Sequence, residues 1–298
     1  MNRMLTLLVA LCLPLLAWAQ DQTDALASLK VEEENIRFAP APAEDDLAAT
    51  DEMYTINKKV DWPIVIAGSA WSAYAFSKIY SKDTTRLAKI LELNKEDING
   101  FDRWAAGKND DKASDNSDFL FYGSMPLPAL LLIDKHIRKD AAKVGFLYWE
   151  AFAITGLLYT GSTYFVDRFR PETYATNLPP EEKVDGNYKN SFFAGHVAVV
   201  ATSTFFMAKV YSDYHPDSKF KYVLWGGAAA ATGTMVYLRH IAGKHFPSDL
   251  VIGTAVGALS GILVPHLHKN KRLEDRAWML SPAMGQGYSG LTFTYKIK

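Results

Sequence analysis

The chain is nearly free of cysteine: among its 298 residues only Cys12 is one. Cys12 lies within residues 1–20, where Arg3 precedes an apolar run from Met4 to Leu16 and then the small-residue site Ala17-Trp18-Ala19. This pattern is typical of a signal peptide that is removed after export. The exported chain would have no thiol, which excludes disulfide bonds, thiolate nucleophiles and cysteine-bound metal.

The chain also lacks an excess of positive charge. It has 32 lysine and arginine residues against 33 aspartate and glutamate residues, and a formal net charge of -1. A protein that binds nucleic acid needs a basic surface for the phosphates, so nucleic acid is not an expected partner. Only residues 21–57 are strongly biased, with ten acidic side chains against Lys30 and Arg37. We expect them to form a solvated, partly disordered arm.

Strand-like alternation is scarce between residues 60 and 270, where Ala, Leu and Met are plentiful. Apolar stretches alternate there with polar connections, which favours helices over sheet. We expect helices over residues 62–77, 119–133, 146–166, 197–208, 222–238 and 250–265. The sequence therefore predicts an all-α six-helix bundle, residues 58–270. Residues 271–298 are expected to form a short C-terminal tail, whose last nine residues alternate like one strand.

Long uninterrupted apolar runs are few. A membrane span needs about 20 apolar residues, whereas the runs here have 12 to 17, except for the third, which contains Glu150. In the sixth segment, Gly253, Gly257 and Gly261 follow one another four apart, a stripe that allows close helix contact, as in membranes or in tight soluble packing. Embedding in the inner membrane is favoured, and a soluble periplasmic bundle is the alternative.

The connection 134–143 bears on the orientation of such a membrane protein. It contains four lysine or arginine residues, as a cytoplasmic loop does. The third helix would then run outward, and Arg170 would face the periplasm.

Three clusters near the ends of the last four helices contain groups that phosphate transfer requires. The first is Asp167-Arg168-Phe169-Arg170-Pro171, after the third helix. Pro171 ends the helix and restricts where Arg170 points. A planar guanidinium pairs with two phosphate oxygens at once. Alternatively, such an arginine bonds the exposed carbonyls of the helix end.

The second cluster runs from Asn190 to His196 and opens the fourth helix. Gly195 lets the chain turn sharply into the helix, and the free amides of the first turn direct partial positive charge toward an anion. His196 stands at that edge, where it can give a proton to a departing alcohol oxygen. A solvated or capping histidine is the alternative.

The third cluster runs from Arg239 to Asp249, between the fifth and sixth helices. Pro247 as the first helical residue places Asp249 in the opening turn, where it can reach back to the ring of His245. A carboxylate that accepts one imidazole N–H leaves the other ring nitrogen free to attack phosphorus. Arg239 can neutralise the equatorial phosphate oxygens. Solvated loop charge is the alternative.

Together the clusters resemble the type 2 phosphatidic acid phosphatase and vanadium haloperoxidase superfamily, over about residues 62–267. The motifs of that family are Lys, six residues, Arg-Pro; Pro-Ser-Gly-His; and Ser-Arg, five residues, His, three residues, Asp. The matching positions here are Arg170-Pro171, Gly195-His196, Arg239, His245 and Asp249.

The resemblance implies a phosphoric monoester hydrolase that needs no metal or cofactor. His245 would form a phosphohistidine, Asp249 would orient it, and His196 would be the general acid. Phosphate would be bound by Arg170, Arg239 and the amide of Gly195. Vanadate would be a cofactor only if the protein were a haloperoxidase.

Four positions depart from the family pattern. Thr163 replaces the lysine, Phe193-Ala194 replaces Pro-Ser, and Leu238 replaces the serine. Each lost charge-assisted contact costs roughly 1.5–3 kcal/mol, so phosphate affinity should fall unless Arg168 or Lys244 takes over. The bond-making residues remain, which favours a divergent but active enzyme over a non-catalytic family member.

The expected activity is hydrolysis of a lipid phosphate or prenyl pyrophosphate at the periplasmic face of the cell envelope. A soluble periplasmic acid phosphatase for small phosphomonoesters is the nearest alternative. A haloperoxidase is disfavoured because Thr163, Ala194 and Leu238 remove three anion donors.

Overall fold

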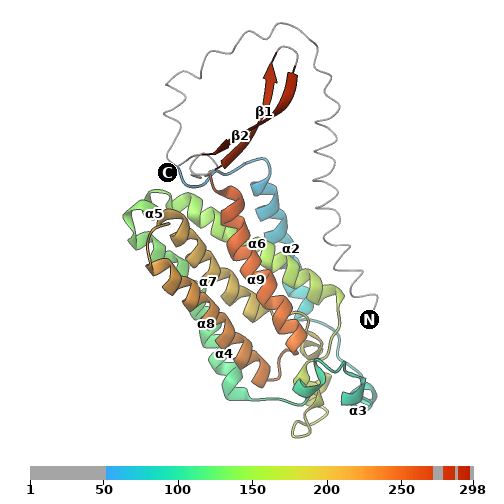
Figure 1. Ribbon diagram of the computed structural model, residues 1–298. Coiled ribbons are helices and arrows are strands. Elements are labelled where there is room, and N and C mark those ends of the chain that lie inside the picture. The colour runs from blue at the N-terminus through green and yellow to red at the C-terminus, as the bar shows by residue number, and fades with distance from the viewer. Residues whose placement is uncertain (1–51, 271–277, 286–287, 296–298) are drawn as a thin grey trace. The chain divides into compact units, whose positions relative to one another are not determined.

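The computed structural model describes residues 52–270, 278–285 and 288–295. The expected signal peptide, residues 1–20, and residues 21–51 of the expected acidic arm lie outside this range. Between residues 61 and 268 the chain forms a helical bundle (Figure 1). Its long elements are α2 (Asp61–Ile79), α4 (Asp111–Ser124) with the 3-10 helix η4 (Leu127–Ile133), α6 (Ala141–Phe165), α7 (Gly195–Tyr214), α8 (Phe220–Ile241) and α9 (Pro247–His268). All six expected segments fall within these elements, so the predicted six-helix bundle is confirmed.

Short helices occupy the connections between the long ones. Between α2 and α4 lie α3 (Leu87–Leu91), η2 (Lys95–Asp97) and η3 (Arg103–Ala105), and α5 (Lys135–Lys139) precedes α6. Between α6 and α7 lie η5 (Pro171–Tyr174), η6 (Glu182–Val184) and η7 (Gly186–Lys189).

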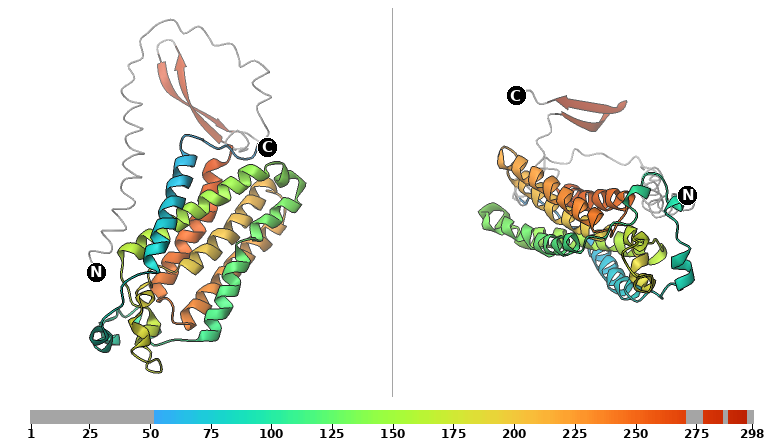
Figure 2. Two further views of the ribbon diagram at one scale, coloured as in Figure 1. Left: turned by 180° about the vertical axis from the view of Figure 1, so that it is seen from behind. Right: turned by 90° about the horizontal axis from the view of Figure 1, so that it is seen from below.

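The two long connections, residues 80–110 and 166–194, meet at one end of the bundle (Figures 1 and 2). The amide of Thr85 bonds the carbonyl of Val184 at 2.7 Å, and the amide of Gly107 bonds that of Pro171 at 2.8 Å. Residues 242–246 join them, because the Glu172 amide bonds the Gly243 carbonyl at 2.9 Å. We call this end, made of residues 80–110, 166–194 and 242–246, the loop end.

The second segment begins earlier than its apolar run, which predicted a helix over residues 119–133. The side chain of Asp110 accepts a hydrogen bond from the Ala113 amide at 2.9 Å and caps α4 at its start. The polar residues 111–118 are therefore helical. The α-helix stops at Ser124, before Pro126 and Pro128, since proline lacks the amide donor that a helix interior requires.

The central helix of the bundle is α7, which packs against α4, α6, α8 and α9. Its contact with α9 runs along the glycine stripe. A Cβ atom on Gly257 would lie 2.2 Å from the carbonyl oxygen of Ala198, and one on Gly253 would lie 2.5 Å from that of Ala194. The stripe therefore does what its spacing predicts, bringing α9 into backbone contact with α7.

Residues 52–57 differ from the expected disordered arm. Tyr54 is completely buried, and its hydroxyl donates to the Asp213 carboxylate at 2.9 Å. Its backbone also forms an isolated antiparallel bridge with Lys269. Within residues 52–57 only Tyr54 is buried, but this side chain attaches the segment to the ends of α7 and α9, so here the prediction of a disordered arm is wrong.

The C-terminal part of the chain forms a hairpin rather than a single strand. Strand β1 (Trp278–Gly285) pairs antiparallel with β2 (Tyr288–Tyr295), with Trp278 opposite Tyr295 and Gly285 opposite Tyr288. The alternation that predicted a strand belongs to β2. Its partner β1 contains a proline and shows weaker alternation.

Candidate active site

The three sequence clusters lie at the loop end. The end of α6 leads into Arg168 and Arg170, the start of α7 carries His196, and Arg239 lies in the last turn of α8. His245 and Asp249 lie just before α9 and in its first turn. The charges of Arg170, Arg239 and His196 all act on the ring of His245. The predicted residues therefore converge on one site.

His245 is held by the backbone. Its side chain is buried, and its Nδ1 lies 2.6 Å from the carbonyl oxygen of Ser191. A carbonyl only accepts, so Nδ1 carries the hydrogen and Nε2 keeps its lone pair. Burial and the nearby guanidinium groups of Arg239 and Arg170 hold the pKa of His245 well below its ordinary value. The ring is thus neutral at neutral pH, as a nucleophile must be.

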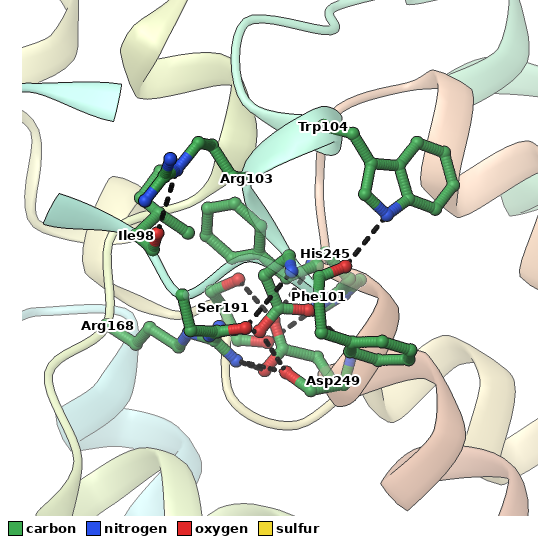
Figure 3. A network of polar contacts seen from close by, with 12 residues as sticks. Ile98, Phe101, Arg103, Trp104, Arg168, Ser191, His245 and Asp249 are labelled. Atoms are coloured by element: carbon green, nitrogen blue, oxygen red, sulfur yellow. Dashed lines mark hydrogen bonds and ion pairs between the residues drawn. The ribbon is translucent and has the colours of Figure 1, made fainter. Parts of the chain in front are cut away.

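The predicted bond between Asp249 and His245 is wrong. Asp249 is completely buried, and its Oδ2 accepts from the Ser191 hydroxyl at 2.7 Å and from the Phe246 amide at 2.9 Å. In the first turn of α9 the carboxylate reaches back to the start of its own helix, as a capping box does, instead of reaching the ring. It therefore positions His245 indirectly, through Ser191 (Figure 3).

Arg168 does not stand ready to bind phosphate. One guanidinium nitrogen, Nη1, pairs with Asp249 and bonds the Ser248 hydroxyl at 2.9 Å, and Nη2 pairs with Asp102 at 2.7 Å. The guanidinium also lies over the Phe246 ring, 4.6 Å from its centre. The expectation that Arg168 replaces a lost phosphate contact is therefore wrong, because two buried carboxylates hold it.

Asp102 was not anticipated from the sequence. It lies just before η3 and is buried, and it accepts from both the amide and the hydroxyl of Ser248, at 2.9 and 2.7 Å. It thereby joins the first long connection to the start of α9. No motif marks it. The one hint in the sequence is Arg168, because a largely buried arginine needs a carboxylate partner and no such partner was assigned to it.

Lys244 is also paired. Its Nζ lies 2.5 Å from the Glu172 carboxylate, whose other oxygen is 3.4 Å from Nη1 of Arg170. Glu172 is buried just after the Arg-Pro pair, and it too was missed. Gly243 permits the tight turn before Lys244, with a φ of 68° and no room for a Cβ atom against Lys108. Lys244 therefore neutralises Glu172 in this structure, contrary to the expectation that it could bind phosphate.

Arg170 and Arg239 retain unused donors. Among the described residues, neither buried Nε atom has a hydrogen-bond partner. A buried donor without an acceptor is costly, and two of them beside His245 suit an anion with several oxygens. This observation fits phosphate at the site.

Helix α4 supplies partners that the sequence analysis missed. Ser117 accepts from Nη1 of Arg239 at 3.0 Å, and Asp118 lies 3.1 Å from Nε2 of His196. The expected second helix began only at residue 119, so neither residue was considered. Burial and the charges of Arg239 and Arg170 hold the pKa of His196 well below its ordinary value.

Packing explains Gly195 of the second cluster and Thr163, the α6 residue that departs from the family pattern. A Cβ atom on Gly195 would lie 2.6 Å from the ring of Tyr159, so glycine allows α7 to begin there. Thr163, which replaces the family's lysine, donates to the Phe192 carbonyl at 3.0 Å. Thr163 therefore supports the loop before α7.

Comparison with known proteins agrees with this geometry. Residues 145–273 match the sequence model of the PAP2 superfamily. These residues therefore resemble the PAP2 superfamily in sequence. The match starts within α6 and ends just after α9, so it contains all three clusters. Members of the PAP2 superfamily are generally phosphatases, which supports phosphatase activity here. No curated protein and no solved structure matches the chain.

The first prediction concerns the tether between Asp249 and Ser191. Ser191→Ala keeps the carbonyl that bonds His245 but removes the hydroxyl bonded to Asp249. Loss of a hydrogen bond to a charged group costs about 1.5–3 kcal/mol, so kcat should fall about 10- to 100-fold, with KM little changed. Steady-state kinetics would measure both. Ser162→Ala is the control, since its hydroxyl bonds only within α6. Unchanged kcat in Ser191→Ala would contradict the positioning role.

Proposed function

We propose that the protein hydrolyses a lipid phosphate or prenyl pyrophosphate through a phosphohistidine intermediate on His245. The observation that carries this proposal is a neutral, buried imidazole with a free Nε2 beside two arginines with unpaired Nε donors. The resemblance to the PAP2 superfamily supports the same chemistry.

The reaction would proceed in two displacements. Nε2 of His245 attacks phosphorus, the bond from phosphorus to the leaving oxygen breaks, and His196 gives that oxygen a proton. Water then attacks phosphorus while His196 takes a proton from it, the phosphorus–nitrogen bond breaks, and phosphate leaves with His245 restored. Arg170 and Arg239 would stabilise the charge on the equatorial oxygens in both steps.

His196 must be protonated for the first step, although its pKa is depressed in the free protein. Burial lowers this pKa most, and the charges of Arg239 and Arg170, the proposed phosphate ligands, lower it further. A bound phosphate offsets their positive charge, so it should raise the pKa of His196 again. Substrate binding would thus convert His196 into an acid.

A cavity beside the site suits an apolar substrate tail. It has a volume of about 430 Å³, lies between α2, α4, α6 and α7, and has Gly195 and His196 in its wall. The rest of its lining is largely apolar or aromatic, and includes Phe76, Phe121, Trp149, Phe152 and Val199. A tail in this cavity would leave its head group beside the general acid.

The outer surface of the bundle is compatible with a bilayer. Helices α6 and α9 are long and apolar enough to cross a membrane. Helix α9 is longer than its apolar run, residues 250–265, because the polar residues at both of its ends are helical too. Large apolar side chains are exposed on the outer helices, among them Ile66, Phe119, Leu130, Trp149, Val223, Leu259 and Leu267. A substrate that resides in the membrane could enter the cavity from there.

The helix directions constrain the topology. Helix α2 starts at the end opposite the loop end and runs toward it. A cleaved signal peptide would place residue 21 outside, and a single crossing by α2 would then put the loop end in the cytoplasm. The expected export signal and a periplasmic site agree only if an even number of crossings separates them, or if the bundle is a soluble periplasmic protein.

A soluble enzyme for small phosphomonoesters remains the second candidate. It is favoured because, among the described residues, only two helices are long and apolar enough to cross a membrane.

The second prediction tests the nucleophile. His245→Ala should lower phosphate release at least about a thousandfold, because the covalent step is lost. Wild type mixed with labelled substrate and denatured in alkali, where a phosphorus–nitrogen bond survives, should retain the label, and the variant should not. His240→Ala is the matched control, a histidine whose ring lies 4.4 Å from that of Trp104, outside the site. Wild-type protein inactive on phosphatidic acid, isoprenyl pyrophosphates and a chromogenic phosphate would favour the non-catalytic alternative.

The third prediction tests the cavity as the site of the lipid tail. Ser72 of α2 lines it, so Ser72→Phe should fill space that a tail would use. Displacing two methylene groups costs about 1.6 kcal/mol, so kcat/KM for a long-chain phosphate should fall about tenfold. Activity on p-nitrophenyl phosphate should be unchanged. Ser77→Phe, on the exposed face of α2, serves as control. An equal loss for both substrates would contradict a tail in the cavity.

The fourth prediction concerns the side of the membrane. We propose that the loop end faces the periplasm, supported by the basic connection 134–143 at the other end. In a Cys12→Ser background, Glu181→Cys at the loop end should react with an impermeant maleimide on intact cells, and Lys135→Cys should not. The opposite pattern would place the site in the cytoplasm. Labelling of both cysteine variants would instead indicate a soluble periplasmic protein.

A further inference from the structure

A separate group of charged side chains lies at the end of the bundle opposite the loop end. Asp61 is the first residue of α2, Glu150 lies in α6, and His268 is the last residue of α9. One ligand atom from each lies within 4.8 Å of the others. Along α9, about 28 Å of helix rise separates His268 from Asp249. The cluster is therefore separate from the candidate active site.

The histidine of this cluster presents its Nε2 atom to the carboxylates. Nδ1 of His268 lies 2.8 Å from the carbonyl oxygen of Val264, so Nδ1 carries the hydrogen. Nε2 lies 3.1 Å from Oδ2 of Asp61 and 3.5 Å from Oε2 of Glu150. Two carboxylate oxygens this close to one ring nitrogen require a positive charge between them, either a proton on Nε2 or a bound cation. A histidine that binds a metal typically donates its other N–H to a carbonyl in this way.

Glu150 provides the second, independent observation. Its side chain is only 3% exposed, and its Oε2, the oxygen that faces His268, accepts no hydrogen bond from any described residue. A buried carboxylate without donors is costly, and more so in an apolar helix that is long enough to span a membrane. Asp61 is anchored by contrast, since its Oδ2 accepts from the Asn57 amide at 2.6 Å. The unsatisfied oxygen of Glu150 therefore calls for a cation at this point.

We propose that Asp61, Glu150 and His268 bind one divalent cation of the zinc class. Imidazole and carboxylate together are ligands that zinc accepts, at about 2.0–2.2 Å. Tetrahedral bonds of that length separate the ligand atoms by about 3.4 Å, close to the 3.1 and 3.5 Å found here. Water would complete the coordination. The ion would join the start of α2, the interior of α6 and the end of α9.

The test uses the full-length protein, purified without a histidine tag and stripped with a chelator. Titration with Zn²⁺ alone, followed by native mass spectrometry, should give one bound ion per chain and a higher thermal midpoint. Glu150→Gln and His268→Ala should weaken binding at least about tenfold and abolish the thermal shift. The titration of wild type needs no variant, so it stays decisive if a variant fails to fold.

The control is another group of potential metal ligands, which is more exposed and consists of Asp134, His136 and His215. His215→Ala should leave zinc binding unchanged. Loss of binding in His215→Ala but not in His268→Ala would overturn the assignment. No bound zinc in wild type would overturn the proposal and make a protonated His268 the cation. Neither result bears on the phosphatase, which uses residues at the loop end.

Discussion

The candidate site depends on one buried negative charge, that of Asp249. A carboxylate without solvent must be paired with a cation and hydrogen-bonded, and Arg168, Ser191 and the start of α9 meet that need. Each partner makes a further contact. Arg168 also pairs with Asp102, which accepts a hydrogen bond from Ser248. The carbonyl of Ser191 accepts a hydrogen bond from His245. The proposed nucleophile, His245, is thus aligned by the neutral carbonyl of Ser191, and the charge of Asp249 acts on it only through Ser191. This arrangement leaves the ring of His245 without a negative neighbour, so burial and the nearby arginines together keep its pKa low.

The basic side chains of the site fall into two groups. Arg168 and Lys244 are neutralised by buried carboxylates and hold the loops together. Arg170 and Arg239 also lie near carboxylates, Glu172 and Asp118, but among the described residues their Nε atoms have no partner and stay available to an anion. With Thr163 in place of the family's lysine, two guanidinium groups must balance the phosphate. The proton that we propose His196 gives to the leaving oxygen would then matter more, because less positive charge stabilises that oxygen.

The helices and the convergence of the clusters could be predicted, because apolar periodicity and motif spacing are local properties of the sequence. The partners of the site residues could not. The carboxylate of Asp249 is within reach of several donors, and only the fold decides between the ring of His245 and the hydroxyl of Ser191. Asp102 and Glu172 pair with Arg168 and Lys244, and these pairs form only where the loops pack together. Asp118 was missed for a simpler reason: the polar first turns of α4 carry no apolar signal, and their cap at Asp110 was not recognised.

Helix α9 connects these features physically. Its first turn contains Asp249, so any shift of α9 along its axis would move the carboxylate away from Ser191. The glycine stripe opposes such a shift, because the backbones of α7 and α9 are in contact and the Ala194 amide bonds the Asp249 carbonyl at 3.2 Å. The last turn of α9 is held as well, since the His268 carbonyl accepts from the Thr55 amide at 2.9 Å. A helix fixed at both ends and along its length keeps the nucleophile's supports in place without any direct bond from Asp249 to the ring.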